Sequence, residues 1–210
     1  MKSNRSHASD AAGSRANPLV RVFCAIELPA ALNSAVVDHI SRLRLDVPDT
    51  RASWEKGDKL HVTLKFFGEI SQDKVAVVTD AAAAASLNIS PLQLSLNGAG
   101  AFHSRGMPKV LWLGIEDKSG ELERLHSRLE SACEDMGIKR EERPFHPHLT
   151  IARIRSSAGA KELASAHRAL GFEAQGFQAS ELCVMRSELA PEGSLYSEIS
   201  RHSLLPNVSE

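Results

Sequence analysis

The sequence predicts an α+β fold made of two small, mostly antiparallel sheets with helices on the outside. Strand-like and helix-like segments are intermixed, and several neighbouring strands follow one another as hairpin-like pairs without a helix between them. The order strand, helix, strand, helix, strands occurs in the first half of the chain and loosely again in the second. One strand in each half carries the same four-residue pattern, so we expect two pseudo-symmetric lobes that face each other across a central cleft.

The expected elements follow from the spacing of apolar residues. Apolar positions three or four residues apart indicate helices, and continuous or alternating apolar runs indicate strands. Ser71 stands where it can cap a helix, Gly68 ends the strand before it, and residues 98–106 are expected to form a glycine-rich turn. Trp54, in a predicted loop at residues 46–57, is expected to pack over the strand that follows. We expect strands at residues 20–28, 59–67, 92–96, 110–115, 148–154, 172–177, 180–186 and 196–204, and helices at 30–45, 71–87, 122–133 and 159–170.

Composition and charge describe an ordinary globular chain. Residues 1–18 are polar and small and are expected to form a disordered leader, followed by a single bilobal domain at residues 19–206 with one motif in each lobe. The 210 residues are 42% hydrophobic and 24% charged, with a formal net charge of -1. A chain without net positive charge does not grip long RNA along its length, so only a terminal nucleotide or two would be recognised.

Cysteine use and hydropathy bear on location. The three cysteines (Cys24, Cys133 and Cys183) are odd in number, widely spaced and without a CxxC pair, which favours buried free thiols in a reducing compartment. The N-terminus has no apolar core of a signal peptide, and no apolar stretch approaches 18 residues. We therefore expect a cytoplasmic, monomeric protein without a membrane partner.

The most informative feature is a matched pair of strand motifs. His61-Val62-Thr63-Leu64 is followed 87 positions later by His148-Leu149-Thr150-Ile151. Side chains alternate between the two faces of a strand, so the histidine and the threonine of each motif point the same way while the apolar residues point into a core. Each motif strand therefore presents an imidazole beside a hydroxyl.

Two such strands suit a reaction that removes one proton and delivers another. An imidazole titrates near neutrality, so one histidine can act as a base while the other, protonated, acts as an acid. A phosphodiester is a substrate of this kind, because a hydroxyl or water attacks phosphorus while an alkoxide leaves. The threonine hydroxyls would lie beside the phosphate and donate hydrogen bonds to its non-bridging oxygens. The pair of motifs therefore predicts a phosphodiesterase.

The segments HVTLKFFGE and RPFHPHLTIAR resemble the two HxTx signatures of the 2H phosphoesterases. The chain is similar in particular to the bacterial and archaeal RNA 2′,3′-cyclic phosphodiesterases, also called 2′-5′ RNA ligase-like proteins. The resemblance spans residues 20–204 and includes Trp54 and the flanking segments RVFCAIELP, AFHSRGMPKVLWLGI and CVMRSELAPEGSLYSEI. One HxTx motif can arise by chance, whereas two with these flanks are specific.

The resemblance implies a bilobal fold and metal-independent opening of a 2′,3′-cyclic phosphate to a 2′-phosphomonoester, with no cofactor. By position, His61 would protonate the departing 3′ oxygen and His148 would activate the water. Thr63 and Thr150 would hold the phosphate. The partners implied are RNA ends or nucleotides with a cyclic phosphate, and joining such an end to a 5′-hydroxyl would be a minor reverse activity.

Further candidates for substrate contact lie near the motifs. His146 stands where the family often has a basic residue, commonly arginine, and would add a third titrating group near the cleft. Arg153 matches the trailing arginine of the family, although strict alternation places it on the strand face opposite Thr150, where an ion pair is the alternative. His103 and Arg105 lie in a glycine-containing loop that could overhang the cleft.

Several alternative interpretations stay open. His146 and His148 could form a metal pair, because residues i and i+2 share a strand face. Other possible functions are an RNA-end-binding module without turnover, or an esterase for another cyclic phosphate such as ADP-ribose 1″,2″-cyclic phosphate or a nucleotide. Phe66, Phe67 and Trp112 are expected in the core rather than as platforms for a base. The remaining histidines of the folded region are expected on the surface or on helix faces: His39, His126, His167 and His202.

Overall fold

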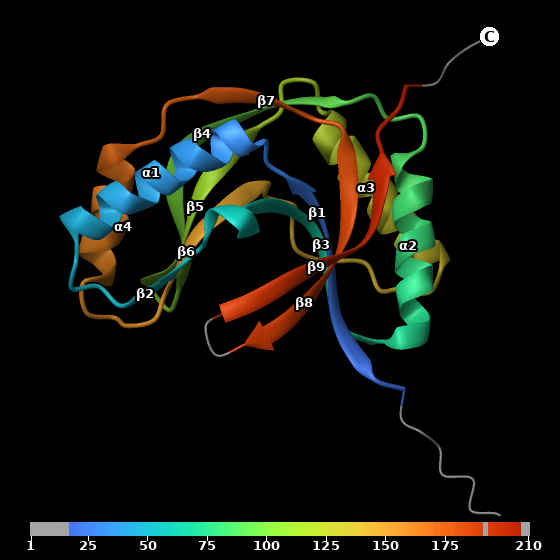
Figure 1. Ribbon diagram of the computed structural model, residues 1–210, viewed down its shortest axis with the longest axis horizontal. Helices are drawn as coiled ribbons and strands as arrows, with labels where there is room; N and C mark the ends of the chain where they lie inside the picture. The colour runs from blue at the N-terminus through green and yellow to red at the C-terminus, as the bar shows by residue number, and fades with distance from the viewer. Residues whose placement is uncertain (1–16, 191–192, 207–210) are drawn as a thin grey trace, which may run out of the picture.

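The computed structural model describes residues 17–190 and 193–206, so nearly all of the expected leader lies outside the described residues. Within them the chain forms one curled nine-stranded sheet with α-helices packed around it (Figure 1). All strand pairs are antiparallel. The predicted α+β class is confirmed.

Most elements lie close to their predicted positions. The strands are β1 (Leu19–Glu27), β2 (Ala52–Trp54), β3 (His61–Ser71), β4 (Leu92–Ser104), β5 (Met107–Glu116), β6 (His148–Ile154), β7 (Gln175–Ala179), β8 (Glu181–Ala190) and β9 (Gly193–Ser203). The helices are α1 (Ala30–Asp46), α2 (Gln72–Ser86), α3 (Glu121–Asp135) and α4 (Ala160–Leu170), with a 3-10 turn η1 at Gly57–Lys59.

The sheet consists of two halves with the same arrangement of strands. The strand order is β7-β4-β5-β6-β3-β1-β8-β9, so the two motif strands, β3 and β6, are neighbours at its centre. They are joined by a single residue pair, Val62 with Leu149, and both of these side chains are fully buried. Each half is a motif strand followed by three further strands. The two expected sheets are therefore continuous at one point and separate on either side of it.

Neither half of the sheet corresponds to one half of the sequence. Helix α4 packs on β4 and β5 with α1 beside it, whereas α2 and α3 pack together and cover the half that contains β3 and β1 (Figure 1). Helix α1 follows β1 in the chain but lies over the other half of the sheet. The last hairpin, β8–β9, returns to β1. Each half is thus assembled from interleaved segments, which the order of elements along the chain did not indicate.

Two predicted connections are wrong. The expected turn at residues 98–106 is largely strand, because β4 continues to Ser104 and the chain reverses only at Arg105 and Gly106, which have φ angles of 51° and 73°. Gly98 with a φ of 74° forms a bulge opposite β5, which lets the strand continue past it. A Cβ atom on Gly100 would overlap the Trp112 ring, so that glycine serves close packing rather than a turn.

The expected loop at residues 46–57 contains the short strand β2. This strand pairs with β6, and Trp54 lies opposite Ala152. Trp54 is therefore beside the second motif strand, whereas it was expected to pack over the first. Ser71 does precede α2 directly, but its side chain makes no capping hydrogen bond.

Two of the histidines expected on the surface or on helix faces do lie on helices, but on their buried faces. His39 of α1 and His167 of α4 are 6% and 0% exposed, and their Nε2 and Nδ1 atoms are 3.1 Å apart. His167 Nε2 donates to the carbonyl oxygen of Trp112 at 3.0 Å, so its Nδ1 accepts the proton of His39. Burial lowers the pKa of both rings, that of His39 to about 4. This neutral pair ties both outer helices to β5.

The cysteines agree with the prediction, since Cys24, Cys133 and Cys183 are free and buried. Among the described residues, every α-helix is too short or too polar to cross a lipid bilayer.

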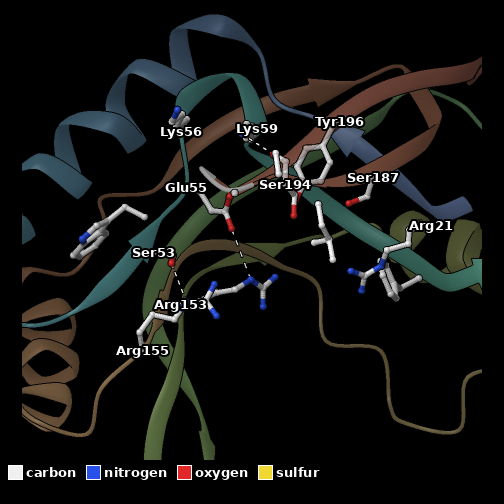
Figure 2. A pocket seen from close by; sticks show the side chains of 15 residues that line it. Arg21, Ser53, Glu55, Lys56, Lys59, Arg153, Arg155, Ser187, Ser194 and Tyr196 are labelled. Atoms are coloured by element: carbon white, nitrogen blue, oxygen red, sulfur yellow. Dashed lines mark hydrogen bonds and ion pairs between the residues drawn. The ribbon is translucent and has the colours of Figure 1, made fainter.

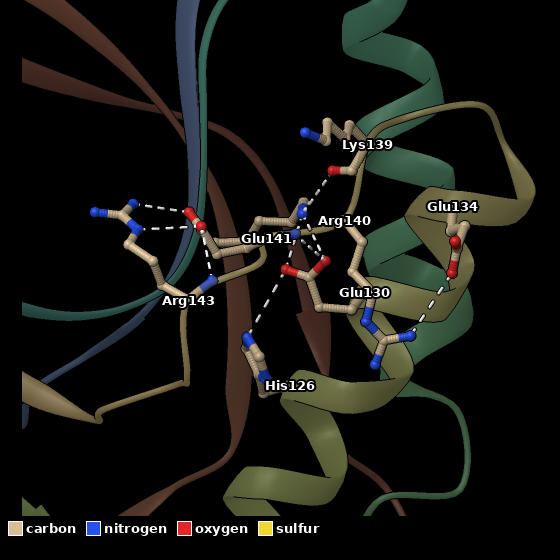
Figure 3. A network of polar contacts seen from close by, with 8 residues as sticks. His126, Glu130, Glu134, Lys139, Arg140, Glu141 and Arg143 are labelled. Carbon is tan, nitrogen blue, oxygen red and sulfur yellow. Dashed lines mark hydrogen bonds and ion pairs between the residues drawn. The ribbon is translucent and has the colours of Figure 1, made fainter.

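A buried ion pair joins β3 to α3 and to the segment that leads into β6. Lys65 Nζ donates to both carboxylate oxygens of Glu130 at 2.7 and 2.8 Å, and the two side chains are only 4% and 1% exposed. Lys65 also donates to the carbonyl oxygen of Lys139, and Glu130 accepts from the backbone N–H of Glu141 at 3.1 Å. His126 lies 3.8 Å from Glu130 (Figure 3). The network therefore fixes residues 139–141 against the first motif strand.

Candidate active site

The four motif side chains lie on one face of the sheet around the central pair. Val62 and Leu149 point into the core, so their neighbours in the strands point to the opposite face. Antiparallel pairing of Val62 with Leu149 directs His61 toward Thr150, and Thr63 toward His148. All four are partly exposed. The expectation that histidine and threonine share a face within each motif agrees with this alternation, and the central pair brings the two motifs together.

Both histidines are held in the same tautomer. His61 Nδ1 lies 2.7 Å from the carbonyl oxygen of Lys59, and His148 Nδ1 lies 2.7 Å from that of His146. A carbonyl oxygen only accepts, so each Nδ1 carries a proton and donates it. In each motif the acceptor is the residue two positions before the histidine. Nε2 is therefore the nitrogen of each ring that is left to exchange a proton.

Aromatic rings flank both imidazoles. The rings of Phe23 and Tyr196 lie 4.8 and 5.3 Å from His61, centroid to centroid. Phe102 packs edge-on against His148 at 4.8 Å. None of these three aromatic residues was predicted to contact a motif histidine. They come from β1, β9 and β4, and only the folded sheet brings them to the motifs.

A β-bulge at the fourth position of each motif changes which later residues share the site face. Leu64 in β3 and Ile151 in β6 are the extra residues where the pairing register shifts. Leu64 and the residue after it, Lys65, are both buried, and so are Ile151 and Ala152. The next side chain in each strand then returns to the face of the motif.

As a result, Arg153 lies on the same face as Thr150, and the prediction that it falls on the opposite face is wrong. Its Nε is 3.8 Å from a carboxylate oxygen of Glu55, so the expected ion pair exists, but on the cavity side of the strand (Figure 2). The corresponding residue of the first motif is Phe66, which is 53% exposed rather than buried in the core as expected.

Burial lowers the pKa of both motif histidines. The positive charge of Arg153 acts in the same direction on both rings. The hydrogen bond to a backbone carbonyl raises the pKa of each ring, but the charged neighbours differ: the carboxylate of Glu27 raises the pKa of His61, whereas a charge on the His146 ring lowers that of His148. Glu27 is directly opposite His61 in the pairing of β1 with β3. The two halves are thus similar in geometry but not in charge.

A large cavity adjoins the motif face. Its volume is about 940 Å³, and it lies between β2, the end of β6 and the β8–β9 hairpin (Figure 2). The four motif residues are not among those that line it. Three residues that line the cavity connect it to the motifs. Tyr196 contacts the ring of His61, and the carbonyl oxygen of Lys59 accepts a hydrogen bond from His61 Nδ1. The charge of Arg153 lowers the pKa of both histidines. A smaller cavity of about 230 Å³ is lined by His61 itself together with Phe23 and Tyr196.

The remaining candidates are all exposed. His146 is exposed, and its ring lies 5.4 Å from Phe102 and 5.1 Å from Trp112, so it belongs to the surroundings of His148. His103 and Arg105 lie exposed at the turn between β4 and β5.

Neither cluster of potential metal ligands is well suited to an ion. Among the described residues, no third ligand lies close enough to share an ion with His146 and His148. A different group, Glu27, Cys183 and Glu198, lies close together. Its acidic residues already bind the guanidinium of Arg201, 2.7 Å from Glu27.

Comparison with known proteins identifies the family. A sequence profile of the 2′-5′ RNA ligase superfamily matches residues 32–190. The RNA 2′,3′-cyclic phosphodiesterase of Methanothermobacter thermautotrophicus is 31% identical over 183 residues, which are 86% of this chain and 96% of that protein. The Escherichia coli protein of the same name is 30% identical over 66% of this chain and 74% of its own.

Solved structures agree with this match. Escherichia coli LigT in complex with 3′-AMP superposes with a TM-score of 0.71 at 25% identity, covering 89% of this chain and 99% of that one. A protein of Thermus thermophilus has the same fold, with a TM-score of 0.75 at 24% identity and coverage of 89% and 99%.

The class defined by this fold is that of the 2H phosphoesterases, and the expected resemblance is confirmed. The chain belongs to the 2′-5′ RNA ligase superfamily. Its curated relatives are hydrolases named RNA 2′,3′-cyclic phosphodiesterase, in agreement with the expected class of enzyme.

Proposed function

We propose that the chain hydrolyses the 2′,3′-cyclic phosphate at RNA or nucleoside ends to a 2′-phosphomonoester, by acid/base catalysis with two histidines and without a metal. His61 is the acid that protonates the departing 3′ oxygen, and His148 is the base that activates water. Thr63 and Thr150 donate hydrogen bonds to the phosphate. The observation that carries the proposal is the central Val62–Leu149 pair, which sets the two motifs side by side on one face.

The fixed tautomers support this division of the proton transfers. With Nδ1 of each ring donating to a backbone carbonyl, a protonated His61 offers Nε2–H to a leaving oxygen and a neutral His148 offers the lone pair of Nε2 to a water. Burial keeps both rings neutral near pH 7 in the free protein. The negative charge of a bound phosphodiester favours protonation of a neighbouring imidazole, so substrate binding supplies the acid form.

The difference in charge supports His61 as the acid. The carboxylate of Glu27 favours the protonated form of His61, whereas no carboxylate in the described part of the chain acts on His148 and a positive charge on the His146 ring favours its neutral form. Burial is the largest influence on both rings and lowers the pKa of each, and the carboxylate of Glu27 acts against it at His61 alone. A minor activity, joining a cyclic phosphate end to a 5′-hydroxyl with a 2′-5′ linkage, would use the two groups in the same roles: His148 would take the proton of the attacking 5′-hydroxyl, and His61 would protonate the departing 3′ oxygen.

Glu27→Gln tests the direction of proton transfer. Removing the carboxylate lowers the pKa of His61, so less of the protein carries the acid at any pH. We expect the optimum of kcat/KM to move to lower pH and its maximum to fall by about two- to fivefold. A pH profile of cyclic-phosphate hydrolysis measures both. If His61 were the base, the same lowering of its pKa would raise the maximum instead.

Glu181→Gln is the matched control for this variant. Glu181 and Glu27 both bind the guanidinium of Arg201, at 2.6 and 2.7 Å, but only Glu27 is paired with His61. Each variant removes one ion pair of Arg201, so any effect of losing such a pair appears in both variants. A shift of the optimum in Glu27→Gln alone therefore reports the influence of the carboxylate on His61.

Metal removal separates this proposal from the metal-pair interpretation of His146 and His148. We expect full hydrolysis of a 2′,3′-cyclic nucleotide in excess EDTA. Loss of turnover in EDTA that one added metal ion restores would contradict the two-histidine mechanism. Binding of cyclic-phosphate ends without any turnover would favour an RNA-end-binding module.

A further inference from the structure

The large cavity beside the motif face has an unusual charge for this chain. The whole protein has 25 lysine and arginine residues against 26 aspartate and glutamate residues. The residues that line the cavity include only one carboxylate, Glu55, but five cationic side chains: Arg21, Lys56, Lys59, Arg153 and Arg155. An excess of this size in one concave surface points to an anionic ligand.

Among the described residues, four of these cations form no ion pair with a carboxylate. Arg153 forms its ion pair with Glu55, and Lys59 donates to the carbonyl oxygen of Ser194 at 2.6 Å. Arg155 donates to the hydroxyl of Ser53, which leaves its charge uncompensated. Lys56 is exposed, and neither it nor Arg21 or Arg155 forms an ion pair within residues 17–190 and 193–206. In addition, Arg21 Nε is buried without a hydrogen-bond partner.

Aromatic surface accompanies the charges. Phe66 is one of the more exposed large apolar side chains, at 53%, and the Arg21 guanidinium lies over its ring at 5.6 Å from the centroid. Trp54 and Tyr196 also line the cavity. Cationic side chains alternating with aromatic faces are the combination that binds single-stranded nucleic acid, because phosphates contact the cations and bases stack on the rings.

The cavity is connected to the motif histidines. Tyr196 contacts His61, and Lys59 provides the carbonyl oxygen that orients the His61 ring. Phe66 and Arg153 are the first side chains to return to the motif face beyond the two bulges. A strand that ends at the histidines can therefore continue into the cavity.

We propose that this cavity binds the ribonucleotides that precede the terminal cyclic phosphate, with their phosphates on Arg21, Lys56 and Arg155 and a base on Phe66. The inference rests on the proposed function. A 2′,3′-cyclic phosphate lies at the 3′ end of an RNA, so the chain extends from it in the 5′ direction only. The preferred substrate is then a short single strand rather than a mononucleotide.

The test compares substrates of increasing length. Adenosine 2′,3′-cyclic phosphate and the adenosine di- and trinucleotides with the same terminus are hydrolysed by the wild-type chain and by Arg21→Gln, Arg155→Gln and Phe66→Leu. We expect wild-type kcat/KM to rise about tenfold or more from one to three nucleotides. Each arginine variant lowers the trinucleotide value about three- to tenfold and weakens its salt dependence, and Phe66→Leu lowers it about fivefold. Hydrolysis of the mononucleotide stays unchanged in all three.

Lys161→Gln, which removes the same charge from the exposed surface of α4, is the control and is expected to change neither substrate. Equal kcat/KM for all lengths in the wild type, or equal losses on mono- and trinucleotide in the variants, would overturn the inference while leaving the proposed function intact. Failure of the wild type to hydrolyse any of the three substrates would instead overturn the proposed function, and the inference with it.

Discussion

His61→Ala and His148→Ala are each expected to lower kcat/KM for a 2′,3′-cyclic phosphate by about 10²–10⁴-fold. This is the usual contribution of one general acid or base. The substrate still binds, because the threonine hydroxyls and the other histidine remain. Initial rates with a cyclic mononucleotide measure the loss. His202→Ala, on the outer strand β9, is the matched control and is expected to retain full activity.

The double variant His61→Ala/His148→Ala tests whether the two rings act as a unit. Two groups that move protons in one displacement lose their joint contribution when either is removed, so the double variant is expected to be little worse than the poorer single variant. Wild-type rates in either single variant would rule out the acid/base assignment.

Lys65→Met is expected to give the largest loss of stability, about 3–5 kcal/mol in the free energy of unfolding. Both members of the Lys65–Glu130 pair are almost fully buried, and removing one of them leaves an uncompensated charge in the core. Urea unfolding of the wild type and the variant measures the difference. Adding Glu130→Leu to Lys65→Met is expected to restore part of the stability, because no unpaired charge then remains.

Lys139→Met is the control for this prediction. Lys139 pairs with Glu142 at 2.7 Å, but the two side chains are 82% and 77% exposed. An exposed pair contributes about 1 kcal/mol or less, so this variant is expected to unfold close to the wild type. Similar losses for Lys65→Met and Lys139→Met would contradict the importance of the buried network.

The motif faces could be predicted because alternation along a strand is local. His61 and Thr63, like His148 and Thr150, share a face through backbone geometry alone. The same rule failed for Arg153, since it assumes an unbroken strand. The bulge at Ile151 depends on how β6 pairs with β5, and β5 is far away in the sequence.

The aromatic surroundings of the motifs could not be predicted. Phe23, Phe102 and Tyr196 reach them only because β1, β4 and β9 are placed by long-range pairing. The exposed Phe66 was assigned to the core because apolar side chains usually are buried, and its neighbour Lys65 is buried instead.

The buried histidines illustrate a similar limit. His39 and His167 lie among apolar residues on the inward faces of α1 and α4, but no local pattern shows that these two helices, far apart in the sequence, pack together. Their burial is explained by two hydrogen bonds, from His39 to His167 and from His167 to the carbonyl oxygen of Trp112. A polar residue in a core needs such partners, and these lie on three separate elements.

The most direct test of the two-histidine site is phosphorus NMR of an RNA oligonucleotide with a terminal 2′,3′-cyclic phosphate, incubated with the protein in excess EDTA. The spectrum reports both turnover and which bond to phosphorus breaks. We predict complete conversion to the 2′-phosphomonoester, since His61 protonates the 3′ oxygen. A 3′-phosphomonoester product, or an unchanged cyclic phosphate, would contradict the proposal.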